Sequence, residues 1–126
     1  MSATNRGAIR KEKDFYATPA ASVTSLLNVM TIPTAGTFLE PCRGAGDIYN
    51  RIECRQRLYC ELSEGRDYLT WKPSCRTDLI ITNPPFSERG NDRTADFILR
   101  ALDLAGQGVA MFVRSQWISE GVDRYE

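Results

Sequence analysis

The sequence predicts an α/β fold built on a largely parallel sheet. Two mostly apolar runs, at 78–82 and 108–113, are typical of strands that are covered on both faces. An amphipathic helical pattern lies between them at 93–106, and a shorter strand pattern followed by a glycine-containing turn precedes them. Strands that alternate with helices in this way favour an α/β sandwich.

Length and composition fit one domain. The chain has 126 residues and a formal net charge of zero, so composition alone does not indicate a nucleic-acid-binding protein. We expect a flexible arm at residues 1–13 and a single domain at 14–126. The polar N-terminal segment has no secretory signal pattern and no apolar run is long enough to span a membrane. We therefore expect a cytoplasmic protein without a membrane partner.

Histidine is absent, and the four cysteines contain no Cys-x-x-Cys pair. The cysteines are Cys42, Cys54, Cys60 and Cys75. No metal site is therefore expected, and free or buried thiols are the simplest interpretation. Proton-transfer chemistry has to use carboxylates, tyrosine or solvent, or to need no strong base.

The first elements follow from capping residues and apolar spacing. Thr18 and Pro19 are typical of a helix start, with the threonine as N-cap and the proline at the first helical position. The apolar face of this helix comprises Val23, Leu26, Leu27 and Met30. The run 37–40 predicts a short strand. After the turn at 41–47 we expect a short helix with Ile48 and Ile52 facing inward.

The second half of the chain repeats this alternation. We predict a strand at 58–62, while 65–71 is ambiguous and could hold a vestigial strand. In the helix at 93–106 we expect Ile98, Leu102 and Ala105 on the dry face. The expected wet face comprises Arg93, Asp96, Arg100, Asp103 and Gln107.

Polar residues lie at or just after the end of each predicted strand, where ligands bind in sheets of this kind. They are Glu40, Glu61, Asn83 and Arg114. Because the carboxyl ends of parallel strands share one edge of the sheet, we expect these residues to converge there. This convergence is the main reason to predict a ligand site.

The turn after the first strand combines a carboxylate with glycines. Glu40 suits a cationic ligand such as a sulfonium or an ammonium group, whereas a phosphate-binding loop would carry lysine or bare amides. Gly44 and Gly46 permit positive φ angles and a close approach of the backbone. The alternative interpretation is a tight connection that binds no ligand.

Two further acids extend the site toward a nucleoside. Glu61 lies about twenty residues beyond the first strand, the usual offset of an acid that hydrogen-bonds ribose hydroxyls. Asp67 could accept a hydrogen bond from an adenine amino group. A solvated loop carboxylate is the alternative for Glu61.

The sharpest signal is the segment Asn83-Pro84-Pro85-Phe86, directly after the apolar run 78–82. Residues before proline adopt extended conformations, and prolines expose carbonyl groups without offering N–H donors. With the side-chain carbonyl of Asn83, the segment forms a cradle of acceptors suited to an amino group. Phe86 can stack on a planar base or amide. A purely structural double-proline turn is the alternative.

Together these motifs resemble those of the S-adenosylmethionine-dependent amino-methyltransferases, especially the adenine-N6 DNA methyltransferases. The segment 83–86 is similar to the catalytic motif of that family, 40–46 to its cofactor loop, and 15–19 to the segment that closes over the methionine end of the cofactor. The resemblance extends from about Asp14 to Trp117. It implies a Rossmann-like class I methyltransferase fold.

The resemblance also implies the roles of individual residues. The catalytic set would be Asn83, Pro84, Pro85 and Phe86. The residues that bind S-adenosylmethionine would be Tyr16, Thr18, Pro19, Glu40, Pro41, Cys42, Gly44, Gly46, Glu61, Asp67 and Asn83. The implied substrate is the N6 amine of adenine in DNA, flipped out of the duplex to reach the site.

The chain departs from the family after the run 108–113. Family members usually have further strands and a target-recognition region, so we expect the C-terminal strands to be missing or incomplete. An uncovered sheet edge would favour self-association or a partner subunit that completes the sheet. Two alternatives stay open: transfer to RNA or to a protein glutamine, and a non-catalytic module that only binds the cofactor.

Overall fold

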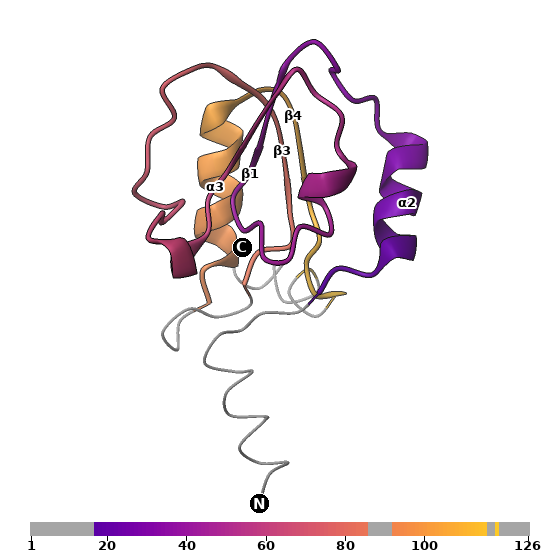
Figure 1. Ribbon diagram of the computed structural model, residues 1–126. Helices are drawn as coiled ribbons and strands as arrows, with labels where there is room; N and C mark the ends of the chain where they lie inside the picture. The colour runs from indigo at the N-terminus through magenta and orange to yellow at the C-terminus, as the bar shows by residue number, and fades with distance from the viewer. Residues whose placement is uncertain (1–16, 86–91, 116–117, 119–126) are drawn as a thin grey trace, which may run out of the picture.

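Four parallel strands form one sheet in the order β2-β1-β3-β4 (Figure 1). The computed structural model describes residues 17–85, 92–115 and 118. The strands are β1 (Thr37–Glu40), β2 (Gln56–Tyr59), β3 (Thr77–Thr82) and β4 (Ala105–Met111). The predicted α/β fold with a parallel sheet is confirmed. The arm predicted at 1–13 lies outside the described residues.

Helices cover both faces of the sheet, as Figure 1 shows. On one face, α2 (Ala20–Val29) and the 3-10 helix η1 (Tyr49–Arg51) close a core around Phe38, Leu79 and Ile81. On the other face, α3 (Thr94–Leu104) packs over Leu39 and Ile80. The three layers arise because successive residues of a strand point to opposite faces, so each apolar strand supplies both cores.

The turn after β1 is followed by a 3-10 helix rather than by an α-helix. Ile48 and Ile52, which flank η1, are both buried, as their spacing predicted. No helix in the described ranges is long and apolar enough to cross a membrane.

Two strands differ from their predicted bounds. β2 covers Gln56–Tyr59 rather than 58–62, because parallel pairing with β1 begins at Thr37 and Gln56, which is exposed at the sheet edge. β4 begins at Ala105, directly after α3, rather than at 108. The apolar pattern finds the buried part of each strand, but hydrogen bonding between strands sets where pairing begins.

The segment 65–71 forms no strand. A second 3-10 helix, η2 (Leu62–Glu64), ends at Gly65, whose φ is 85°. One antiparallel bridge then joins Glu61 to Arg66. The chain turns immediately afterwards, because the N–H groups of residues 70 and 71 both donate to the carbonyl of Asp67.

The dry face predicted for α3 is wrong at Leu102, which is 63 % exposed. The residues of α3 that are buried are Thr94, Phe97 and Ala101. The helix is rotated relative to the prediction because the ring of Phe97 packs against Tyr68, with ring centroids 4.9 Å apart. Arg100, predicted on the wet face, is half-buried, and its Nε donates to the carbonyl of Tyr68 over 2.8 Å.

Candidate functional site at the carboxyl ends of β1 and β3

The site is positioned by the order of the strands. From β1 the chain passes to β2 on one side, and it then returns to form β3 on the other side of β1. The connections that follow β1 and β3 therefore diverge, and open α/β sheets bind ligands beyond the carboxyl ends of the strands at such a point, which we call the crevice. The four strands all end at the lower edge of the sheet in Figure 1. Glu40 ends β1 and Asn83 follows β3.

Glu40 is the unusual residue of this crevice. It is only 1 % exposed, yet the carboxyl oxygen Oε1 has no hydrogen-bond partner in the described part of the chain. The other oxygen, Oε2, accepts a hydrogen bond from the hydroxyl of Thr82 over 3.1 Å. A buried polar atom without a partner is costly and rare in native proteins, so it indicates a place for a ligand group.

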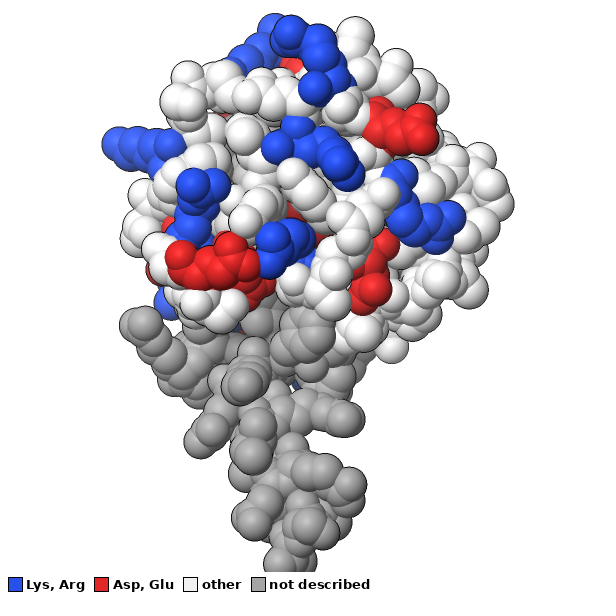
Figure 2. Space-filling view, viewed as in Figure 1, with Lys and Arg blue, Asp and Glu red and all other residues white. Residues whose placement is uncertain are grey.

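Burial raises the pKa of the Glu40 carboxyl to about 9. The hydrogen bond from Thr82 and the backbone N–H of Tyr49 oppose this increase, while the nearby carboxylates of Asp47 and Glu61 add to it. The acid is therefore neutral at pH 7 until a cation compensates its charge. Figure 2 shows acidic and basic side chains side by side on the lower part of the described surface.

Arg43 does not supply this cation. Its guanidinium lies over the ring of Tyr59, 4.1 Å from the centroid, and it forms an ion pair with Glu64. The arginine closest to Glu40 in sequence is thus already neutralised. The crevice keeps an acidic character that favours a positively charged ligand group over a phosphate.

The turn after β1 has the conformation that its glycines predict. The φ angles of Gly44 and Gly46 are 56° and 93°. Pro41 is buried, Cys42 is half-buried, and the N–H of Gly46 donates to the carbonyl of Arg43 over 2.9 Å. A Cβ atom on Gly46 would lie 2.6 Å from Nδ2 of Asn50, so this position accepts only glycine without rearrangement.

The two acids predicted to contact a nucleoside, Glu61 and Asp67, also accept hydrogen bonds from backbone N–H groups of the turn after β1 and of the segment after β2. Oε1 of Glu61 accepts from the N–H of Gly44 over 2.8 Å, and its Oε2 accepts from the N–H and the hydroxyl of Ser63. Oδ1 of Asp67 accepts from the N–H of Leu69 over 3.0 Å. Glu61 therefore joins the end of β2 to the glycine turn that follows β1.

The Asn-Pro-Pro turn is anchored on both sides. The carbonyl of Thr82 accepts from the N–H of Phe112 over 3.0 Å, which extends the pairing of β3 with the chain after β4. Pro84 is buried, and Pro85 and Asn83 are half-buried. Nδ2 of Asn83 donates to the hydroxyl of Thr18 over 3.2 Å.

Most of the predicted site residues lie along this edge of the sheet. The strands bring Glu40 and its turn next to Asn83, and the bond from Asn83 brings Thr18 to the same place. Pro19 is exposed and is the N-cap of α2, so the prediction of Thr18 as N-cap is wrong. Tyr16 and Phe86 lie outside the described residues.

Sequence reasoning missed Thr82 as a site residue. It was interpreted only as the last residue of an apolar strand, whereas its buried hydroxyl joins β3 to the carboxyl of Glu40. A polar side chain at the end of such a strand, immediately before the Asn-Pro-Pro turn, was the available signal.

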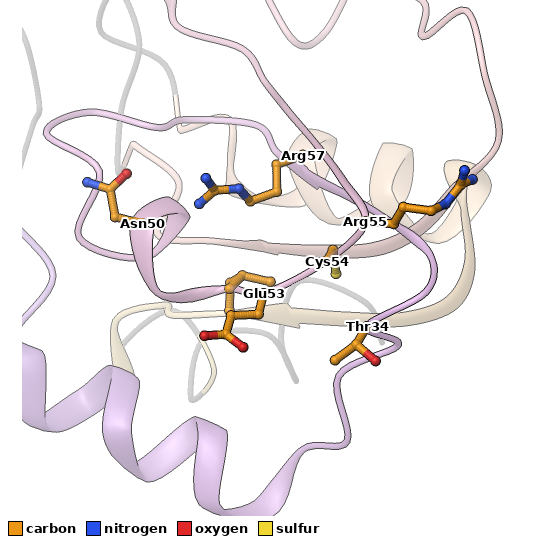
Figure 3. A pocket seen from close by; sticks show the side chains of 7 residues that line it. Thr34, Asn50, Glu53, Cys54, Arg55 and Arg57 are labelled. Carbon is orange, nitrogen blue, oxygen red and sulfur yellow. The ribbon is translucent and has the colours of Figure 1, made fainter.

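A separate open pocket of about 520 Å³ lies near the start of β2 and contains none of the predicted site residues. Figure 3 shows its lining side chains, which are Thr34, Asn50, Ile52, Glu53, Cys54, Arg55 and Arg57. Its two arginines donate to the backbone carbonyls of Ala35 and Tyr49. These side chains stabilise the local fold, and the pocket lies away from the strand ends where the crevice forms.

Comparison with protein-family models, with curated proteins and with solved structures found no match for this chain.

Proposed function

We propose that the protein binds S-adenosylmethionine and transfers its methyl group to the exocyclic N6 amine of adenine in DNA. One observation carries the proposal: the hydrogen bond from Thr82 to Glu40. It joins the buried acid at the start of the glycine turn to the strand end that carries Asn83, Pro84 and Pro85. A cofactor with a positive charge and an amine that accepts the methyl group would meet at this junction.

The residues of the crevice fit the cofactor in three respects. The partnerless Oε1 of Glu40 favours an ammonium or sulfonium group. The positive φ angles of Gly44 and Gly46 allow the backbone to approach a ligand closely. The strand order, with its divergence between β1 and β3, supports a Rossmann-like class I methyltransferase fold.

The turn after β3 fits an amine as the acceptor. The side-chain oxygen of Asn83 and the backbone carbonyl of Pro84 would accept the two hydrogens of an –NH2 group, which increases electron density on the nitrogen. When bound, S-adenosylmethionine supplies an activated methyl group. Positioning alone could then lower the barrier by on the order of 7–11 kcal/mol at best. The amine proton can leave to solvent, so the absence of histidine does not prevent the reaction.

A methyl-transfer assay tests the proposal. The intact chain is incubated with S-adenosylmethionine that carries a labelled methyl group and with unmethylated duplex DNA, RNA or protein. Digestion and mass spectrometry then identify the modified residue. We expect N6-methyladenine in DNA, and we expect Asn83→Ala to abolish its formation while the affinity for the cofactor changes by no more than a few-fold. The matched control is Asn28→Ala, at an exposed position of α2.

Each other outcome contradicts a defined part of the proposal. Methylated glutamine or methylated RNA would show that the substrate is a protein or RNA rather than DNA, while the proposed cofactor would be unchanged. Binding of the cofactor without methyl transfer to any substrate would indicate a non-catalytic module that only binds the cofactor. If calorimetry detects no binding of S-adenosylmethionine, the whole proposal is wrong.

A further inference from the structure

We propose that the pocket near the start of β2 is a binding site for the phosphate backbone of DNA, with Arg55 and Arg57 as its two cations. The inference rests on the proposed function for the choice of DNA as the ligand, but its test measures binding alone. The pocket is open, has a volume of about 520 Å³ and contains none of the residues proposed to bind the cofactor. It would hold the part of the substrate that carries no acceptor amine.

The crevice itself is a poor place for DNA phosphates. Its buried acid, Glu40, lies near two further carboxylates. The nearby Arg43 is neutralised by its ion pair with Glu64. The whole chain has a formal net charge of zero. Because attraction between cationic side chains and phosphates supplies most of the non-specific affinity for DNA, a DNA substrate requires basic groups gathered outside the crevice.

The two arginines of the pocket carry charges that no carboxylate compensates. Both are exposed, and within the described part of the chain neither forms an ion pair. Nε of Arg55 donates to the carbonyl of Ala35 over 3.2 Å. Nη1 of Arg57 donates to the carbonyl of Tyr49 over 2.9 Å. A carbonyl acceptor fixes the guanidinium group without removing its charge, and each arginine keeps most of its N–H donors for a ligand.

Arg57 is also held by an aromatic ring. Its guanidinium group lies 4.8 Å from the centroid of the Tyr49 ring. A side chain that is already ordered loses less entropy when it binds a phosphate. By contrast, the exposed Arg76 forms an ion pair with Asp78. The arginines of the pocket therefore differ from other surface arginines in being ordered while keeping their full charge.

The acidic residue of the lining, Glu53, does not neutralise these charges. It is exposed, and Figure 3 shows its carboxylate pointing away from both guanidinium groups. Asn50 and Thr34 contribute polar side chains without charge to the same lining. The pocket therefore keeps an excess of positive charge together with neutral hydrogen-bonding groups, which is the composition that suits a phosphate.

The orientation of the two arginines favours a polymer over a small anion. In Figure 3 the guanidinium groups of Arg55 and Arg57 point in opposite directions. A single phosphate ion would contact only one of them. Separate phosphates of a nucleic-acid strand would contact both, and the neutralisation of two phosphates releases two counterions.

The position of β2 allows DNA to reach both sites at once. β2 is at one edge of the sheet in the described residues, and only β1 separates it from β3, which leads to Asn83. The strands β2 and β3 are therefore about 10 Å apart. One helical turn of duplex DNA is about 34 Å long. A duplex whose flipped adenine occupies the crevice can thus place its backbone against Arg55 and Arg57.

Fluorescence anisotropy of a labelled DNA duplex, measured over a range of salt concentrations, tests the inference. We expect Arg55→Gln/Arg57→Gln to weaken binding by about tenfold at low salt, because two charge-assisted hydrogen bonds are lost. The slope of log K against log salt should fall in magnitude by about 1.8, which is about 0.9 for each phosphate contact. The loss should be the same for duplexes of different sequence, because phosphate contacts carry no sequence information.

Two further variants serve as controls. Lys72→Gln/Arg76→Gln removes the same charge at exposed positions outside the pocket lining, and it should keep the wild-type slope. Arg55→Lys/Arg57→Lys keeps the charge and should also keep that slope. Thermal unfolding shows which variants are folded. If Arg55→Gln/Arg57→Gln does not fold, the two single variants take its place, each with an expected change in slope of about 0.9.

Arginines that only protect the sheet edge would leave DNA binding unchanged. An unchanged Kd and slope in Arg55→Gln/Arg57→Gln, or an equal loss in Lys72→Gln/Arg76→Gln, therefore overturns this inference and leaves the proposed function intact. Displacement of DNA by inorganic phosphate beyond that caused by chloride at equal ionic strength, or binding to anionic phospholipid vesicles but not to DNA, also overturns it. DNA binding that depends on both arginines, without methyl transfer, supports this inference and overturns the proposed function alone.

Discussion

The hydroxyl of Thr82 donates a hydrogen bond to Oε2 of Glu40 over 3.1 Å, and both side chains are buried. This contact joins the ends of β1 and β3, two neighbouring parallel strands. The backbone N–H of Tyr49 also acts on this carboxyl, whereas the atom Oε1 has no hydrogen-bond partner in the described residues. The properties of the site follow from this buried acid.

The first prediction concerns stability and pH. The pKa of Glu40 is raised from 4.5 to about 9 in the folded protein, so the folded state binds the proton more tightly than the unfolded state. The stabilisation is fully present below pH 4.5 and is lost as pH rises toward 9. Glu40→Gln cannot titrate. Its free energy of unfolding relative to wild type should therefore improve between pH 5 and pH 8, by at most about 1.4 kcal/mol per pH unit.

Urea unfolding at pH 5, 6, 7 and 8 measures this difference. The control is Asn28→Ala, at an exposed and uncharged position, whose free energy of unfolding relative to wild type should be the same at every pH. A difference between Glu40→Gln and wild type that does not change with pH would show that Glu40 titrates normally.

The second prediction concerns the protonation of Glu40 when a ligand binds. A cationic group at Oε1 stabilises the ionised carboxylate, so binding of S-adenosylmethionine should release a proton from Glu40. The affinity should rise with pH between 6 and 9. Calorimetry in two buffers with different ionisation enthalpies gives the number of protons released. Titration of the ligand's own amine occurs with Glu40→Gln as well, so the difference between the two proteins isolates the contribution of Glu40. Equal proton release by both would exclude Glu40 as the acid that responds to the ligand.

The third prediction separates two causes of glycine dependence, which are backbone strain and contact of an added Cβ atom with a neighbouring side chain. Gly46 and Gly65 both have positive φ angles, but a Cβ atom on Gly65 has no neighbour within 4 Å, whereas one on Gly46 lies 2.6 Å from Nδ2 of Asn50. Gly65→Ala should cost about 1–2 kcal/mol from backbone strain alone. Gly46→Ala should cost about 0.5–1.5 kcal/mol more, because the end of the exposed Asn50 side chain has to leave its preferred rotamer.

The double variant Gly46→Ala/Asn50→Ala checks the assignment, because Asn50 is exposed and its own removal should have little effect. Chemical denaturation should show that the double variant recovers most of the excess loss. If it is no more stable than Gly46→Ala, then contact with Asn50 is not the cause.

The fourth prediction concerns Arg100, which donates to the backbone carbonyls of Tyr68 and Trp71. Arg100→Met keeps the aliphatic stem but leaves both carbonyls without this donor, so it should destabilise the protein by about 1–3 kcal/mol. Arg93→Met removes an arginine that forms an i,i+3 pair with Asp96, and it should change stability by about 0.5 kcal/mol or less. Thermal unfolding of both variants provides the comparison. If the two variants lose the same stability, Arg100 behaves as a solvated residue, as its predicted place on the wet face of the helix implies.

Much of the fold could be predicted because it depends on local patterns. The apolar run of β3 and the periodicity of α2 identified both elements, and the glycine turn after β1 has the predicted positive φ angles. Tertiary contacts determine the features that local sequence patterns do not predict. The rotation of α3 depends on the contact between Phe97 and Tyr68, which are 29 positions apart.

The candidate site was predictable to the extent that each residue follows a strand. The pairing of β1 with β3 was not, because strands that are adjacent in a parallel sheet need not be consecutive in the chain. Two contacts depend on this pairing and on the return of the chain before α2: Thr82 with Glu40, and Thr18 with Asn83. Each one joins residues more than forty positions apart, beyond the reach of any local pattern.

The bond between the Gly44 N–H and Glu61 has a consequence for ligand affinity. Ribose hydroxyls that approach Glu61 meet a carboxylate that already accepts from the glycine turn and from Ser63. If the proposed cofactor binds here, its ribose hydroxyls would share Glu61 with these three donors or displace them, and displaced hydrogen bonds would reduce their contribution to affinity. Adenosine alone should bind weakly, and discrimination between ligands should reside in the charged end that reaches Glu40.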